Sequence, residues 1–202
     1  MPNKLKKVEI LSVHENTNPK FIKTELLKCE REGQEFLWER IKFQDSVHVL
    51  IDNVETREII LVKQVRIPVL VNDDSQNGEI IEVCAGLVDK DVTIQQIAKE
   101  EVLEECGYDI PVDDLEFLKS MKSSVGVAGT NSHAFIARVD ETMKVSEGGG
   151  LPEEDIEVVR IPYDEVDTFF FDGDSHTDVI TMFLITYWLF KFRNSIISSQ
   201  NS

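Results

Sequence analysis

Residues 86–108 read GLVDKDVTIQQIAKEEVLEECGY, and this stretch predicts a short polar loop followed by a helix. Thr93 is a favourable N-cap residue, and Gln96 three positions later completes a capping box. Gly107 suits the end of the same helix, because glycine adopts the left-handed conformation at little cost. The apolar residues Ile94, Ile97, Ala98 and Val102 fall on one stripe. The stretch therefore predicts an amphipathic helix with defined ends.

The same helix carries Glu101, Glu104 and Glu105 at spacings of three and four residues, so their side chains meet on one face. Like charges at these spacings repel and destabilise an isolated helix. A divalent cation would remove that penalty, and Mg²⁺ binds carboxylate oxygens together with water and substrate phosphate. A solvated acidic face is the ordinary interpretation of a glutamate-rich helix. The order of the surrounding residues favours a metal site instead.

That order resembles the Nudix hydrolase signature, G-x5-E-x7-R-E-U-x-E-E-x-G-U, in which U is bulky and apolar. The matching positions are Gly86, Glu101, Val102, Glu104, Glu105, Gly107 and Tyr108. Two positions depart, because Val92 replaces a glutamate and Glu100 replaces an arginine. The resemblance implies that those two positions hold the loop to the helix. Both are replaced together, so neither leaves an unpaired partner, and the helix carboxylates are interpreted as metal ligands.

The rest of the chain predicts strands around this unit. Residues 8–11, 21–23 and 36–41 read as strands of an N-terminal β-meander, and residues 46–51, 58–65, 79–85, 115–122, 133–139 and 156–161 as further strands. Residues 163–170 and 177–193 read as helices. This order predicts an α+β fold, an α/β/α sandwich around a mixed sheet. We expect N-terminal strands in residues 1–42 that contribute to dimerisation and to the substrate site, and a Nudix hydrolase domain in residues 43–197.

Motifs outside the signature extend the resemblance to about residues 35–190. DSVHVLI, EIILVKQVRIPV, EVCAGLVD, GGGL and IEVVRI are similar to the UDP-sugar pyrophosphatase branch of the ADP-ribose pyrophosphatase-like Nudix enzymes. The resemblance implies a homodimer that uses Mg²⁺, or Mn²⁺ in its place, to split UDP-glucose into UMP and glucose 1-phosphate. ADP-ribose is the alternative substrate. A Nudix-fold nucleotide-binding protein with little turnover is a second alternative, which the replacements at Val92 and Glu100 favour.

A second acidic cluster, Glu153 and Glu154, follows three consecutive glycines at residues 148–150. The glycines predict a mobile loop, and mobile loops often bring a catalytic group over a substrate. The resemblance implies a metal ligand at Glu154, a catalytic base at Glu153 and a further ligand in the backbone carbonyl of Ala85. It also places Glu105 among the catalytic residues. An ordinary acidic turn explains Glu153 equally well, so the choice of base between Glu153 and Glu154 stays open.

Three more residues are candidates for substrate binding. Arg66 ends a predicted strand and matches a family arginine that contacts phosphate or ribose. Arginine suits bidentate contact with phosphate. The ordinary alternative is a surface charge at the end of a strand. Trp38 could stack on the base, also across a dimer interface, whereas a core or interface aromatic is the more common role. Gly129 belongs to a segment, GVAGTNS, that resembles the family's substrate loop, although such polar loops are common.

Composition limits the classes of partner. The chain has 202 residues, suited to one domain, and a net charge of −17, which disfavours nucleic acid and anionic membrane surfaces. Its three cysteines match no zinc or redox motif, so free thiols in a reducing compartment are expected. The longest apolar run, residues 179–190, is shorter than the ~20 residues that span a bilayer. Without a recognisable targeting segment, a cytoplasmic protein is expected.

Overall fold

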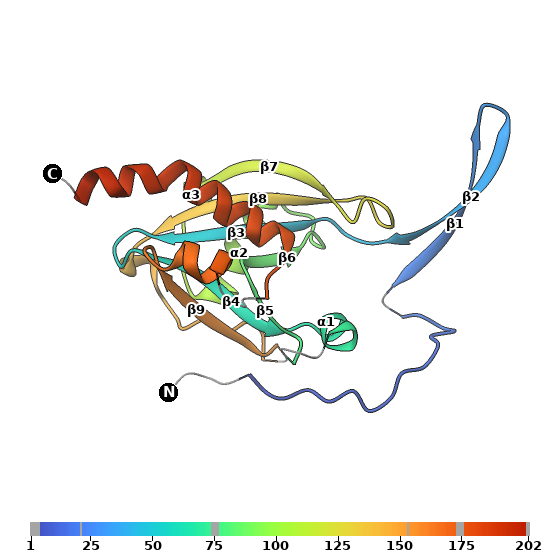
Figure 1. Ribbon diagram of the computed structural model, residues 1–202, viewed down its shortest axis with the longest axis horizontal. Coiled ribbons are helices and arrows are strands. Elements are labelled where there is room, and N and C mark those ends of the chain that lie inside the picture. Colours follow the sequence, from blue (N-terminus) through green and yellow to red (C-terminus); the bar gives the residue numbers. More distant parts are fainter. Residues whose placement is uncertain (1–4, 21, 74–76, 153, 173–175, 201–202) are drawn as a thin grey trace.

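A mixed seven-stranded sheet forms the centre of the computed structural model, which describes residues 5–20, 22–73, 77–152, 154–172 and 176–200 (Figure 1). The strands are β3 Ser46–Asn53, β4 Glu58–Val65, β5 Glu79–Glu82, β6 Cys84–Leu87, β7 Leu115–Ser123, β8 Thr130–Val139 and β9 Ile156–Pro162. Their order is β5-β4-β3-β8-β7, with β6 paired to β3 and β9 to β4. The β3–β8 pair is parallel and the other pairs are antiparallel, so the predicted mixed sheet is confirmed.

Two helices cover the two faces of this sheet. The helix α2 (Ile94–Cys106) packs on one face against β3 residues such as Val49 and Ile51, and α3 (Val179–Gln200) packs on the other against Leu50. Side chains alternate along a strand, which is why neighbouring residues of β3 serve opposite cores. The shorter elements are α1 Ile67–Asn72, η1 Val112–Asp114, η2 Glu141–Met143 and the π-helix η3 Thr168–Asp172. The predicted α/β/α sandwich is confirmed.

The ends of α2 follow the local signals in its sequence. Thr93 is the N-cap, and its hydroxyl oxygen accepts a hydrogen bond of 3.2 Å from the backbone N–H of Gln96. Gly107 ends the helix in the left-handed conformation, with φ of 79°. A Cβ atom added to Gly107 would lie 2.1 Å from the carbonyl oxygen of Ser146, so the absence of a side chain also permits close packing of the next loop. Both predicted ends of the helix are therefore confirmed.

The N-terminal region differs from the predicted β-meander. It contains one antiparallel hairpin, β1 (Lys23–Arg31) with β2 (Gln34–Lys42), and residues 8–11 form no strand. The two-residue turn at Glu32 and Gly33 has positive φ at both positions, as tight hairpins require. The hairpin projects from the body of the protein (Figure 1). Residues 8–11 alternate like a strand but lie outside both sheets, and a strand needs a partner for its backbone groups.

The predicted C-terminal helix is buried on one side only, and its exposed side also carries apolar residues. Leu184, Ile185 and Trp188 are in the core, whereas Val179 and Phe190 at the ends of the apolar run are 83% and 81% exposed. Within the described residues, no helix is both long and apolar enough to cross a membrane. One side of the apolar run therefore builds the second core, and the other side lies at the protein surface.

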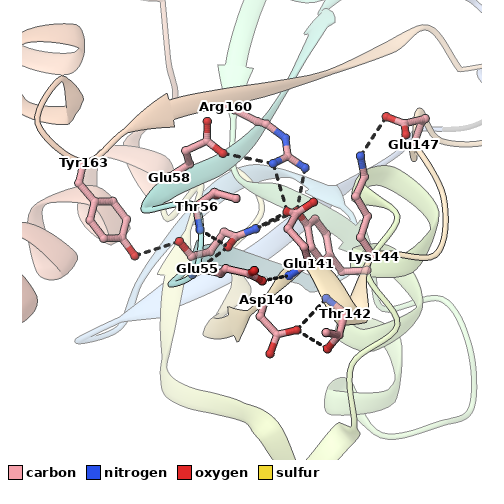
Figure 2. A network of polar contacts seen from close by, with 12 residues as sticks. Glu55, Thr56, Glu58, Asp140, Glu141, Thr142, Lys144, Glu147, Arg160 and Tyr163 are labelled. Atoms are coloured by element: carbon pink, nitrogen blue, oxygen red, sulfur yellow. Dashed lines mark hydrogen bonds and ion pairs between the residues drawn. The ribbon is translucent and has the colours of Figure 1, made fainter.

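A polar network closes the end of the sheet where β3 turns into β4 (Figure 2). The buried Tyr108 hydroxyl accepts hydrogen bonds from Asn53 Nδ2 (3.1 Å) and Arg160 Nη2 (2.9 Å), and donates one to Glu141 Oε1 (3.1 Å). Arg160 also binds Glu58 and Glu141 at 3.2 and 3.3 Å. Both the donor and the acceptor capacity of the hydroxyl are used. The network therefore connects the residue just after α2 to β3, β9 and η2.

We expect Tyr108→Phe to lower the free energy of unfolding by about 1–2 kcal/mol, because the groups that surround the hydroxyl lose a buried partner. Chemical denaturation measures the change. Tyr187→Phe is the matched control, since the Tyr187 hydroxyl has an exposed partner in Lys191 and its loss should cost less than about 0.5 kcal/mol. Equal costs for the two variants would contradict a stabilising role for the network.

Candidate active site

A cavity of about 570 Å³ opens between the start of β3, the end of β4, β6, α2 and the turn before β9. Cavities of this size hold small organic ligands. The lining residues are Phe43, Ser46, His48, Gln64, Arg66, Ala85, Gly86, Leu87, Asp89, Lys90, Glu101, Glu104, Glu105, Leu151 and Glu154. These include every metal ligand predicted from the sequence and one predicted substrate residue, Arg66. The tertiary structure thus brings together residues from four separate stretches of the chain.

Glu105 is the most deeply placed of the helix carboxylates, with 5% of its surface exposed. Its Oε2 atom accepts a hydrogen bond of 3.0 Å from the backbone N–H of Ala85. Ala85 in turn lies opposite His48 in the β3–β6 ladder. The carboxylate is therefore fixed to the sheet through the backbone of β6.

Gly86 allows Glu101 to approach the same strand. A Cβ atom added to Gly86 would lie 2.1 Å from Oε1 of Glu101, well inside van der Waals contact. Any side chain at this position would have to displace either the carboxylate or the strand. The first glycine of residues 86–108 thus acts through tertiary packing, because its missing side chain leaves the space that the Glu101 carboxylate occupies.

Burial makes these carboxylates unusually weak acids. Burial, and then the charge of Glu104, raise the pKa of Glu101 to about 7. Burial raises the pKa of Glu105 to about 8, against the hydrogen bond from Ala85, which favours the charged form. Desolvation and like charge both disfavour ionised carboxylates, and a cation in the cavity would relieve both. The electrostatics of the cavity therefore favour a positively charged ligand.

The chemistry of these donors fits a hard divalent cation, which binds carboxylate and carbonyl oxygens. Among the described residues, however, no three Asp, Glu, His or Cys side chains converge in an arrangement that could hold a metal. One oxygen of Glu105 is engaged by Ala85, and Glu154 Oε2 accepts a hydrogen bond of 2.8 Å from the N–H of Leu151. The types of ligand and their common cavity fit a metal, whereas backbone N–H groups hold the carboxylates of Glu105 and Glu154.

Arg66 brings positive charge to the cavity from the end of β4. Its Nε and Nη2 atoms bind Oε2 of Glu82 at 3.0 and 2.7 Å, and Gln64 Nε2 binds the same oxygen at 3.2 Å. Glu82 is 8% exposed, whereas the side chain of Arg66 is 44% exposed. A buried carboxylate therefore orients a guanidinium that remains accessible from the cavity.

The three glycines at 148–150 attach the next loop to the end of α2. Gly149 N–H donates to the Glu105 carbonyl oxygen at 2.8 Å, and Gly150 N–H to that of Glu104 at 3.1 Å. A Cβ atom on Gly148 would lie 2.2 Å from the Glu105 carbonyl oxygen. These glycines thus provide close packing against the end of α2, and the mobility expected of this loop stays a prediction. Glu154 follows them into the cavity, and Glu153 lies outside the described residues.

Two predicted substrate residues lie away from this cavity within the single chain. Trp38 is on the hairpin, where its Nε1 donates a hydrogen bond of 3.3 Å to the Gly126 carbonyl oxygen, and it lines a separate hollow with Arg31 and Phe36. Gly129 ends a tight turn before β8, with φ of 69°. The structure does not bring either of them together with the carboxylates.

Other lining residues were missed by sequence reasoning. His48 is an example: burial lowers its pKa to about 4, so it is neutral at pH 7. It bonds to Ser46 at 2.8 Å within β3. Lys90 adds a positive charge from the loop after β6. Neither residue has a recognisable ligand spacing, and only strand pairing and loop path place them at the cavity.

Comparisons with known proteins agree with this architecture. A NUDIX domain model matches residues 42–181. A uridine diphosphate glucose pyrophosphatase of Bos taurus is 32% identical over 192 aligned positions, covering 82% of this chain and 86% of the relative. A GDP-mannose pyrophosphatase of Pectobacterium atrosepticum is 36% identical over 129 positions, covering 64% and 65%.

A solved structure, described as an ADP compounds hydrolase, has the same fold, with a TM-score of 0.67 at 20% identity over 92% of this chain and 96% of that one. The family model covers more than half of the chain, and the Bos taurus relative exceeds 30% identity over most of it. The protein therefore belongs to the Nudix family and is a hydrolase.

The buried Glu105 carboxylate predicts a pH-dependent stability. Its pKa is raised from 4.5 to about 8, so the folded chain binds more protons than the unfolded chain in that window. Stability from this group is therefore lost as pH rises from 4.5 to 8. We expect Glu105→Gln, without metal, to raise the melting temperature at pH 8 by about 5 °C, on the order of 2 kcal/mol, and to change it little at pH 4.5.

Calorimetry in the presence of a chelator measures this difference. Glu157→Gln is the control for loss of a carboxylate outside the cavity, because Glu157 lies on β9 and pairs with Lys63 of β4. A gain for Glu105→Gln that stays constant across the pH range would rule out the buried, proton-retaining carboxylate.

Proposed function

We propose that this Nudix hydrolase splits the pyrophosphate bond of a nucleoside diphosphate sugar in an Mg²⁺-dependent reaction, with UDP-glucose converted to UMP and glucose 1-phosphate. One observation carries the proposal: three acidic side chains of α2 share a single cavity with Arg66. Such a cavity combines ligands for a cation with a donor for phosphate, the two requirements for hydrolysis of an anionic anhydride. The activities for which the relatives are named support nucleotide sugars as the substrate class.

The proposed roles follow the positions of the side chains. Mg²⁺, or Mn²⁺ in its place, would be held by the Ala85 carbonyl and the carboxylates of Glu101, Glu104, Glu105 and Glu154. When bound, it would neutralise phosphate charge and make a water molecule more acidic. Arg66, oriented by Glu82, binds a phosphate oxygen through its exposed part. The net charge of −17 makes this local cation important for binding an anion.

The proton of the attacking water requires a base near the cavity. We propose Glu153 for this role, with Glu154 as the alternative, because both closely follow the three glycines in the sequence. One Glu154 oxygen accepts the Leu151 N–H and is thereby oriented, while its other oxygen remains for a ligand or a proton. Loss of activity in Glu154→Gln that high Mg²⁺ partly restores would fit a ligand, whereas loss that Mg²⁺ does not restore would fit the base.

The substrate is tested by measuring monophosphate release from UDP-glucose, ADP-ribose and GDP-mannose, each with Mg²⁺ and with a chelator. We expect the highest kcat/KM with UDP-glucose and almost no turnover without the metal. Glu105→Gln should lower kcat by at least about 100-fold, because the loss of one charged ligand weakens metal binding and the stabilisation of the transition state. Its fold should be retained, as judged by circular dichroism.

Glu157→Gln again controls for charge, and its activity should stay within about twofold of the wild type. Full activity in the chelator, or near-normal kcat for Glu105→Gln at saturating Mg²⁺, would overturn the metal assignment. A higher kcat/KM for ADP-ribose or GDP-mannose would replace UDP-glucose while leaving the reaction type intact.

We also propose that the protein acts as a homodimer in which the β1–β2 hairpin contacts a second copy. The hairpin exposes Leu26 (63%) and Leu37 (62%) on one face and Trp38 (52%) on the other. Isolated two-stranded hairpins have marginal stability in water. A projecting hairpin with apolar side chains on both faces is therefore a surface that a partner would cover.

Light scattering at micromolar concentration should give about twice the chain mass of 23.1 kDa. The double variant Leu26→Asp/Leu37→Asp should give a monomer, because it places charge in the proposed contact. Glu30→Gln on the same hairpin is the control and should remain dimeric. A monomeric wild-type protein with full activity would contradict the proposal.

A further inference from the structure

The loop between β6 and α2 forms one wall of the cavity and is fixed near both ends. At its start, Val88 N–H donates to the Asp45 carbonyl oxygen at 2.8 Å. At its end, Thr93 caps α2. Asp89 and Lys90 between these anchors line the cavity. The position of this wall therefore depends on what holds the middle of the loop.

A side-chain ion pair spans that gap. Lys90 Nζ contacts Glu100 Oε2 at 2.7 Å, and Gln96 Nε2 donates to the other oxygen of Glu100 at 2.9 Å. The pair crosses from the loop to α2, and Gln96 fixes the carboxylate from one turn earlier on the same helix. Glu100 directly precedes the proposed ligand Glu101 on α2, so the ion pair ties the loop to the helical turn that also carries the carboxylate packed against Gly86.

The solvent exposure of this ion pair limits its contribution to the stability of the whole fold. The side chains of Lys90 and Glu100 are 52% and 37% exposed, and ion pairs of this kind contribute little to global stability. A weak ion pair can still fix the middle of this loop, because the loop is already anchored at both ends. The pair is therefore suited to holding the loop locally and not to stabilising the whole fold.

We propose that Lys90 and Glu100 are positioning residues whose ion pair holds the β6–α2 loop against α2 and thereby sets the place of Glu101 in the cavity. The inference rests on the proposed hydrolysis for its kinetic consequence, whereas the effect on the loop is independent of any substrate. The competing role for Lys90 is direct binding of substrate phosphate. Exchanging the charges of Lys90 and Glu100 would then leave activity low, whereas a positioning role predicts that the exchange restores it.

The test compares Lys90→Glu, Glu100→Lys and the exchanged double variant in the full-length protein. Each single variant places like charges together, and the double variant restores an ion pair of reversed polarity. Lys99→Glu is the matched control, because Lys99 pairs with Asp109 at 2.9 Å and also lies on α2, but does not line the cavity.

The first measurement is the backbone order of residues 89–92 by ¹⁵N relaxation without substrate. We expect order parameters near those of the rigid backbone, about 0.85, in the wild type, the double variant and Lys99→Glu, and clearly lower values in the two single variants. Equal order in all five proteins would overturn the proposal. The backbone order of residues 89–92 can be measured without any activity. If the wild type hydrolyses none of the nucleotide sugars, that result contradicts the proposed function and not the positioning role of the ion pair.

The second measurement is kcat/KM on the best substrate at saturating Mg²⁺. The single variants should lose about fivefold or more, the double variant should return to within twofold of the wild type, and melting temperatures should hardly change. A double variant as slow as Lys90→Glu would show that Lys90 acts on the substrate directly and would refute the positioning role. Single variants with wild-type kcat/KM would refute it as well.

Discussion

Close approach between α2 and the backbone around it is the constraint on which the candidate site depends. The Glu101 carboxylate lies where a side chain on Gly86 would be, and Gly148 packs against the carbonyl oxygen of Glu105. A Cβ atom at either glycine would fall within 2.2 Å of a helix atom. The missing side chains therefore let strand, helix and loop meet at distances that no other residue allows, and this packing brings acidic side chains from α2 and from the following turn to one cavity.

The same packing creates an electrostatic conflict. Burial raises the pKa of Glu101 to about 7 and that of Glu105 to about 8. The folded protein therefore surrounds both carboxylates with an environment that disfavours their ionised form. A structure selected for stability alone would favour apolar residues here. The cost is understandable if a cation binds in the cavity during function, because the buried negative charges that destabilise the fold then bind the ion. Arg66 escapes the conflict through its own buried partner, Glu82.

The structure shows where the two residues that depart from the Nudix signature, Val92 and Glu100, lie and what Glu100 contacts. Val92 is 47% exposed in the loop, and Glu100 instead pairs with Lys90, which lies two positions before Val92 in the same loop. The chain thus retains a charged contact between loop and helix, although different residues make it and the acidic partner is on the helix. A signature compares fixed positions, so it does not detect a loop–helix contact whose loop residue is at position 90 and not at position 92. The contact itself depends only on where the charged ends of the side chains lie.

The sequence by itself determined α2, its caps, its acidic face and the mixed sheet, because these follow from local hydrogen bonding, side-chain spacing and a resemblance spread over most of the chain. Only the tertiary structure decided that His48, Glu82 and Lys90 belong to the cavity's surroundings and that Trp38 and Gly129 lie away from it. It also replaced the predicted meander with a single hairpin. Capping and periodicity act within a few residues, whereas the neighbours of a cavity are set by strand order and by backbone approach between segments remote in sequence.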